Sequence, residues 1–329
     1  MKKITLICGA VLVAATMLFV ACGKDKEATI VKFFNVENAT LVSEEMPEAT
    51  SDQTIEVSMN GTAIPGGSSY VSIASEVPAR KILVGMKGQT GYYELLPSAI
   101  RGNEYSFVLM VAQNITLGEE ETTFNVQVAI VDENDEISQI WETNVNLMVV
   151  GTGTLQVSLS FDNAKDVDLH LIEPEYNYED GYPVDFYGRH IYYGHIMSYA
   201  GGELDLDSNA GCSIDNVNNE NITYSGEDVF VAPGTYKVYV DLFKNCDPTI
   251  ATNYVVTVFY GGNLIASRSG RFEVDAESTF NPIDEEYVAE HEPFLTFRIA
   301  DKGQKMVKPF SPAPMTESAM EKEAEAVHK

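Results

Sequence analysis

The sequence predicts an all-β fold made of two β-sandwich domains. Two stretches, residues 124–130 and 155–161, alternate between large apolar residues and polar or small residues. That period of two places one face of each strand in a core and the other face in water. Further runs rich in Val, Ile, Thr, Phe and Tyr are short and separated by turn residues, without helical periodicity, which is typical of a sandwich.

The first 21 residues predict a lipoprotein signal peptide. Two lysines precede an apolar run over residues 4–20, which is short for a permanent membrane span. The run ends in LFVAC (18–22), which resembles a lipobox with Phe19 in place of the usual Leu. We expect cleavage before Cys22 and acylation of that cysteine. An ordinary cleaved signal or an uncleaved anchor is the alternative.

Residues 22–28 are expected to form a charged tether. The sequence GKDKE (23–27) resembles the export signal that sends some Gram-negative lipoproteins to the outer face of the outer membrane. We therefore expect a lipid anchor in the outer membrane, with exposure at the cell surface. A solvated tether without a sorting role is the alternative.

The charge balance limits the class of partner. Asp and Glu number 49 against 21 Lys and Arg, which gives a formal net charge of −28. Such a charge repels phosphate backbones and anionic lipid head groups, so nucleic acid is not expected as a partner. The carboxylates favour solubility outside the cell and can also bind hard cations such as Ca²⁺.

The first expected domain, residues 29–150, has the strand spacing of an immunoglobulin-like sandwich. The expected strands are residues 29–36, 54–59, 81–86, 105–112, 122–131 and 137–150. Residues 132–136 (DENDE) supply turn chemistry between the last two strands, as in a hairpin. The Cys…Trp…Cys core of true immunoglobulin domains is absent.

A short glycine-containing hinge at residues 151–153 leads into the second expected domain, residues 154–301. Residues 155–161 and 236–242 both alternate with a period of two and predict strands. Residues 302–329 contain proline and then become rich in Glu, Lys and Ala. This segment is too short for a stable isolated helix, and we expect a flexible tail.

Five blocks of the second domain resemble the YfaP-like domains, a bacterial family of unknown function. The blocks are GTLQVSLSFDNAKDVDLHLIEPE (153–175), IYYGH (191–195), GGELDLDSNAGC (201–212), NENITY (219–224) and APGTYKVYVDLF (232–243). Phe161 stands where we expect Trp, and no Pro precedes Glu220. The resemblance extends over about residues 153–275 and implies an extracytoplasmic β-sandwich with no established activity.

Two cysteines remain after the signal peptide and the lipid anchor are assigned. An even pair in an oxidising compartment favours a disulfide between Cys212 and Cys246. The bridge would close a loop of roughly 34 residues, which stabilises the fold by about 3–4 kcal/mol through loop entropy. A metal site on the two thiolates is the alternative, although no CxxC spacing supports it.

The segment DLDSNAG (205–211) predicts a calcium site. Oxygen-bearing side chains recur at every second position, and the final glycine can turn the chain. Ca²⁺ takes about six to eight oxygen ligands, several of which one short loop can supply. The expected ligands are Asp205, Asp207, Asn209, Asp215 and Glu220. An Asx-rich turn that satisfies its own backbone amides is the alternative.

A second polar cluster is expected around one strand of the same domain. Asp166, Asp168 and His170 alternate, so they project from one face, and His195 is expected beside them. Repulsion between close carboxylates favours a cation or a hydrogen-bond donor nearby. The wet face of a sheet is one alternative, and a zinc cluster of His170, His190 and His195 is another.

The sequence lacks the common catalytic motifs. GxSxG, HExxH, the P-loop and the dinucleotide fingerprint are absent, and Ser198 near His195 is the one nucleophile considered. We expect a non-catalytic binding or structural module of the cell envelope. The alternatives are a hydrolase of envelope polymers and a glycan-binding lipoprotein of a polysaccharide-uptake system. Tyrosines that could stack on sugar rings are Tyr176, Tyr178, Tyr182, Tyr187, Tyr192 and Tyr193.

Overall fold

The computed structural model describes residues 27–97, 99–118, 121–177, 181–226, 229–278 and 283–300. The expected signal peptide, Cys22, most of the tether, Tyr178 and the C-terminal tail lie outside the described residues. The described part is nearly all β, so the predicted fold class is confirmed. Within these ranges no helix is long and apolar enough to span a bilayer.

The first sandwich consists of two sheets, which we call A and B. Sheet A has the order β1 (Phe34–Val36), β9 (Glu104–Val111), β5 (Ser68–Ser75) and β3 (Ile55–Ser58), with β8 (Ala99–Arg101) beside β9. Sheet B has the order β2 (Thr40–Val42), β7 (Tyr92–Leu95), β6 (Ala79–Met86), β10 (Thr123–Asp132), β11 (Trp141–Leu147) and β4 (Thr62–Ala63). A core that includes Phe34, Val71, Ile82, Val126 and Val128 fills the space between the sheets. The immunoglobulin-like assignment stays a prediction.

This sandwich differs from the expected strands at the start of the first one, and five of its strands, β2, β4, β5, β7 and β8, lie outside the expected ranges. The segment expected as a strand over residues 29–36 begins with a 3₁₀ turn, η1 (Ile30–Lys32), and only Phe34–Val36 is extended. The serine-rich strand β5 lies at the centre of sheet A but was not expected.

The second sandwich consists of sheets C and D. Sheet C has the order β15 (Glu203–Leu206), β16 (Asn219–Tyr224), β12 (Leu155–Phe161), β18 (Thr252–Tyr260) and β19 (Asn263–Phe272). Sheet D has the order β14 (His190–Ile191), β13 (Asp166–Ile172), β17 (Gly234–Lys244) and β20 (Leu295–Ile299). The core between them includes Val157, Leu169, Ile222, Tyr236 and Val256.

Short helical elements interrupt the second sandwich. They are η2 (Tyr187–Arg189), η3 (Ala210–Cys212) and α1 (Glu285–Glu290). Helix α1 begins where the side chain of Asp284 accepts a hydrogen bond from the Tyr287 amide at 2.9 Å.

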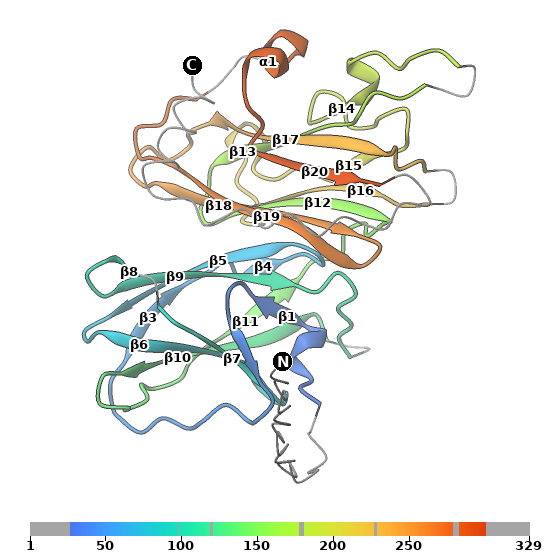
Figure 1. Ribbon diagram of the computed structural model, residues 1–329. Coiled ribbons are helices and arrows are strands. Elements are labelled where there is room, and N and C mark those ends of the chain that lie inside the picture. The colour runs from blue at the N-terminus through green and yellow to red at the C-terminus, as the bar shows by residue number, and fades with distance from the viewer. Residues whose placement is uncertain are drawn as a thin grey trace, which may run out of the picture.

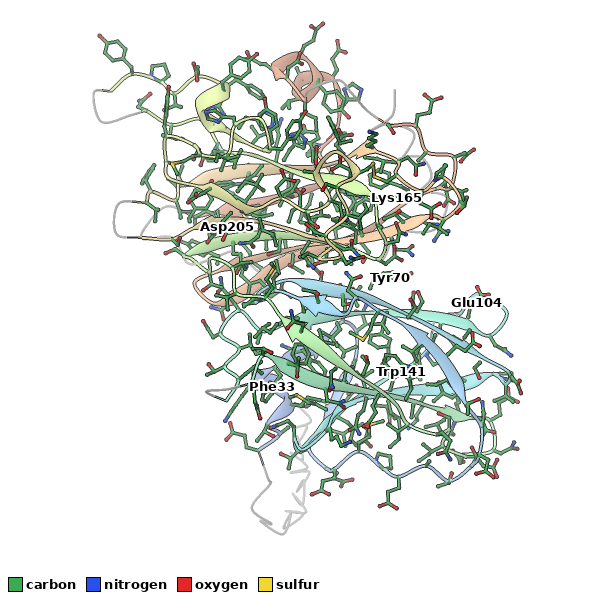
Figure 2. All side chains as sticks on the ribbon, turned by 180° about the vertical axis from the view of Figure 1, so that it is seen from behind. Phe33, Tyr70, Glu104, Trp141, Lys165 and Asp205 are labelled. Carbon is green, nitrogen blue, oxygen red and sulfur yellow. A yellow bond between two sulfur atoms is a disulfide. The ribbon has the colours of Figure 1, made fainter. Side chains whose placement is uncertain are left out.

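The two sandwiches stack with β5 of sheet A facing β12 and β18 of sheet C (Figure 1). The polar face of β12, expected in water, is buried at this junction. Gln156 donates to the carbonyl of Pro65 at 2.7 Å, and the hydroxyl of Ser160 accepts from the Ser68 amide at 3.1 Å. Figure 2 shows Tyr70 of β5 at the boundary between the sandwiches. The junction therefore combines these hydrogen bonds with a small apolar cluster of Val108, Met110 and Val255.

Candidate metal centre

Three acidic side chains from different elements meet at one end of the second sandwich. Asp168 lies on β13, Asp207 follows β15, and Glu220 lies on β16. Glu220 pairs with Leu159 of β12 and therefore faces the space between the two sheets, as that core residue does. Its Oε2 accepts a hydrogen bond from the Leu169 amide of sheet D at 2.6 Å. The carboxylate of Glu220 thus links sheet C to sheet D beside Asp168.

The oxygens of this trio are close enough to hold one cation. One carboxylate oxygen of each residue lies within 4.8 Å of those of the other two. Asp168 and Glu220 are 3% and 1% exposed, whereas Asp207 is exposed. Asp168 Oδ2 and Glu220 Oε1 are buried without a hydrogen-bond partner. Unsatisfied buried oxygens are costly, so a proton or a cation is needed at this position.

The pKa values of Asp168 and Glu220 are raised because these buried carboxyl groups lie close to other acidic side chains. Burial, together with the charges of Asp166, Asp241 and Asp207, raises the pKa of Asp168 to about 9. Burial also raises the pKa of Glu220 well above its ordinary value, with Asp168 and Asp207 adding to the effect. A divalent cation offsets this repulsion and allows the carboxylates to ionise.

Asp166 stands at the border of the cluster. Its Oδ2 accepts a hydrogen bond from the Gly211 amide at 2.8 Å. Burial raises its pKa to about 6, and the neighbouring charge of Lys244 opposes that shift. The contact with Gly211 ties β13 to the loop that carries Asp207.

The other three expected calcium ligands make contacts of a different kind. Asp205 accepts hydrogen bonds from the Gly151 amide at 2.5 Å and from Asn221 at 2.6 Å. Asn209 donates to the Lys165 carbonyl at 3.0 Å, and its Oδ1 accepts from the Asp215 amide at 3.0 Å. Figure 2 shows Asp205 and Lys165 apart on the second sandwich.

Asp215 completes this structural network. It accepts hydrogen bonds from the Ser208 hydroxyl at 2.8 Å and from the Val217 amide at 2.8 Å. Asn209 itself has a positive φ of 62°, as Asx residues in tight turns often do. The loop is therefore fixed by the side chains of Asp205, Asn209 and Asp215. Of the five expected calcium ligands, the structure brings Asp207 and Glu220 together.

The expected polar cluster of β13 is buried and not on a wet face. Asp166, Asp168 and His170 are each 3% exposed or less. His170 Nδ1 lies 3.0 Å from His190 Nε2, and its ring stacks on Tyr192 with centroids 5.2 Å apart. His195 Nδ1 contacts the His190 carbonyl at 3.0 Å. Among the described residues, the three histidines do not gather as a ligand cluster.

Cys212 and Cys246 form the predicted disulfide, with Cα atoms 5.7 Å apart. The bridge joins η3, whose Gly211 holds Asp166, to the residues just after β17. It therefore fixes the loop beside the carboxylates.

Ser198 does not contact His195 in a nucleophile–base pair. Its hydroxyl donates to Glu173 Oε1 at 2.6 Å, and the Tyr224 hydroxyl donates to the same oxygen at 2.5 Å. Burial raises the pKa of Glu173, since the carboxyl group lies in the sandwich interior.

The tyrosines divide between packing and exposure. Tyr192 and Tyr193 pack around His170, and Tyr176 packs against the core. Tyr182 and Tyr187 are 71% and 61% exposed.

No protein-family model and no curated protein sequence matches this chain. The resemblance to the YfaP-like domains therefore stays a prediction that depends on the five sequence blocks.

Proposed function

We propose that this protein is a lipid-anchored, non-catalytic module of the bacterial cell envelope that binds Ca²⁺ through Asp168, Asp207 and Glu220. The observation that carries the proposal is the pair of buried, unpartnered oxygens, Asp168 Oδ2 and Glu220 Oε1. One carboxylate oxygen of each of these two residues lies within 4.8 Å of the other and of an oxygen of the exposed Asp207 carboxylate. Donors that are all oxygen suit a hard cation such as Ca²⁺.

The proposed anchor is the acylated Cys22 of the lipobox-like sequence LFVAC (18–22). Several acyl chains on one cysteine give stable attachment, whereas a single chain binds membranes only marginally. The outer membrane is the proposed location, because GKDKE (23–27) resembles a surface export signal.

A binding role is favoured over hydrolysis by the contacts of Ser198. Ser198 is 5% exposed and its hydroxyl donates to the buried carboxyl group of Glu173, so this oxygen is not presented to a polymeric substrate.

The test compares thermal unfolding of the purified protein in calcium and in EDTA. Extracellular calcium modules bind with a Kd of about 10⁻⁴–10⁻³ M, and calcium at about 100 times Kd stabilises the folded state by roughly 2.7 kcal/mol. We expect calcium to raise the Tm of the wild-type protein and to leave that of Glu220→Gln unchanged. Glutamine keeps an oxygen for the Leu169 amide but lacks the charge that binds the cation.

Glu203→Gln is the matched control, since Glu203 lies on the neighbouring strand β15 and outside the acidic trio. This variant should keep the full calcium shift. The proposal fails if the wild-type Tm does not change at about 10 mM calcium, which is well above the expected affinity range. It also fails if calcium raises the Tm of Glu220→Gln as much as that of the wild type.

A further inference from the structure

A second set of possible ligands shares Asp168 with the calcium site. One ligand atom each of Asp168, His170 and Asp241 lies within 4.8 Å of those of the other two. Asp168 pairs directly with Asp241 across β13 and β17, so both side chains project from the same face of sheet D. His170 follows two residues later in the strand and projects from that face as well. All three side chains are at least 96% buried.

His170 supplies an independent sign that this set has a ligand. Its Nε2 is buried without a hydrogen-bond partner, while its Nδ1 lies 3.0 Å from His190 Nε2. In the tautomer that donates Nδ1–H to His190, the lone pair of Nε2 is available to a metal. Histidines that bind metals commonly donate their other ring nitrogen in this way, which fixes the tautomer.

The rings around His170 hold it in this orientation. Tyr192 stacks on His170 with an interplanar angle of 14°, and on His190 with centroids 4.2 Å apart. Tyr193 meets His170 edge to face at 6.4 Å. A ligand whose ring is fixed before the metal arrives loses little conformational entropy on binding.

The donor chemistry of this set differs from that of the calcium site. One imidazole nitrogen with two carboxylates suits a borderline transition metal such as Zn²⁺, whereas Ca²⁺ prefers oxygen ligands throughout. We propose that Asp168, His170 and Asp241 bind one divalent transition metal, for which Zn²⁺ is the probe, beside the calcium site. The inference goes beyond calcium binding, because His170 and Asp241 are not calcium ligands and Asp168 alone is shared.

The test is calorimetric titration of Zn²⁺ into the full-length mature protein after chelator treatment, with calcium-dependent melting measured in parallel. His170→Gln should weaken the zinc site roughly 100-fold or more, since loss of second-shell contacts alone costs about 10–100-fold. The same variant should keep the calcium shift in Tm, which also shows that it folds. Glu220→Gln should lose the calcium shift and keep zinc affinity.

Two further variants complete the design. His195→Gln is the matched control, because His195 is near His190 but outside the donor set, and it should bind zinc as the wild type does. Asp241→Asn removes the other ligand that the calcium site does not share, and it should also lower zinc affinity. This variant takes the place of His170→Gln if that variant does not fold. Wild-type zinc affinity in either His170→Gln or Asp241→Asn overturns the inference. Loss of zinc affinity in Glu220→Gln also overturns it, since the two metals would then share one site.

Discussion

Asp168 is the residue on which both proposed sites depend. Its carboxyl group is buried beside Asp166, Asp207 and Asp241, and the negative charges of these three residues all oppose its ionisation. Lys165 is buried nearby, but its Nζ donates to Asn245 at 2.8 Å. Without metal, therefore, protonation is the way in which Asp168 avoids a buried, unpaired charge.

This protonation predicts how stability depends on pH in EDTA. The pKa of Asp168 is about 9 in the folded state, against an ordinary value of 3.8. Between these two values the folded state binds an extra proton, so its stability falls as pH rises across this range and levels off above about 9. We expect urea unfolding in EDTA to show lower stability at about pH 9.5 than at about pH 7.5, a window in which ordinary histidines stay neutral. Saturating calcium should reduce this difference, because the bound carboxylates are already ionised.

Asp168→Asn is the control for that experiment. It removes one titrating group and should reduce the pH dependence in EDTA, with the remainder coming from Glu220, whose pKa is also raised. Buried tyrosines with raised pKa values, such as Tyr93, titrate at still higher pH. Equal or greater wild-type stability at the higher pH would show that Asp168 is ionised in the metal-free fold.

At the scale of single elements, alternating patterns predicted strands well and their surroundings less well. The alternation over residues 124–130 became β10, and that over 155–161 became β12. The polar face of β12 was expected in water because a period of two distinguishes the faces of a strand but not what covers them. Strand β5 was not expected, since its serines resemble a loop; Ser68 instead contacts Ser160 at the junction.

The candidate site was predictable only in parts. Local spacing identified Asp168 and His170 on one face, and separately Asp207 and Glu220. Their meeting is a contact between sheets C and D, which no local period encodes. Strict alternation predicts that Asp205 and Asp207 share one face of their strand. A register shift between Leu204 and Leu206 disrupts the regular pairing of β15, so this alternation does not hold there.

The disulfide predicts a linked effect on stability and calcium binding. Cys212 and Cys246 enclose a sequence separation of 34 residues, and removing such a bridge costs about 3–4 kcal/mol by loop entropy. The double variant Cys212→Ser/Cys246→Ser should unfold at lower urea concentration and bind calcium more weakly, because the Gly211 amide beside the bridge holds Asp166.

Reduction of the wild-type protein should reproduce both changes and leave the double variant unaffected. Unchanged calcium affinity in the double variant would mean that the loop keeps its position without the bridge.

At the scale of the whole molecule, the sheets stack in the order B, A, C and D. Sheet C lies between the junction and sheet D, so the carboxylates of β13 belong to the sheet farthest from the first sandwich (Figure 1). Hydrogen bonds across the junction, such as Gln113 to Gln156 at 2.9 Å and Ser267 to Glu37 at 3.0 Å, restrain the two sandwiches. An anchor at the N-terminal end would therefore present the proposed metal sites away from the membrane.

The lipid anchor is the prediction that concerns the chain as a whole. Cys22→Ala removes the proposed acylation site, so the protein should move from the membrane pellet to the soluble fraction when cells are fractionated. Cys8→Ala is the matched control, because Cys8 lies in the segment expected to be cleaved and its loss should leave the protein in the pellet. We expect attachment to depend on the acyl chains, because the remaining chain is strongly acidic and is repelled by anionic lipids. If Cys22→Ala still sediments with membranes, another segment or a membrane-bound partner holds the protein there.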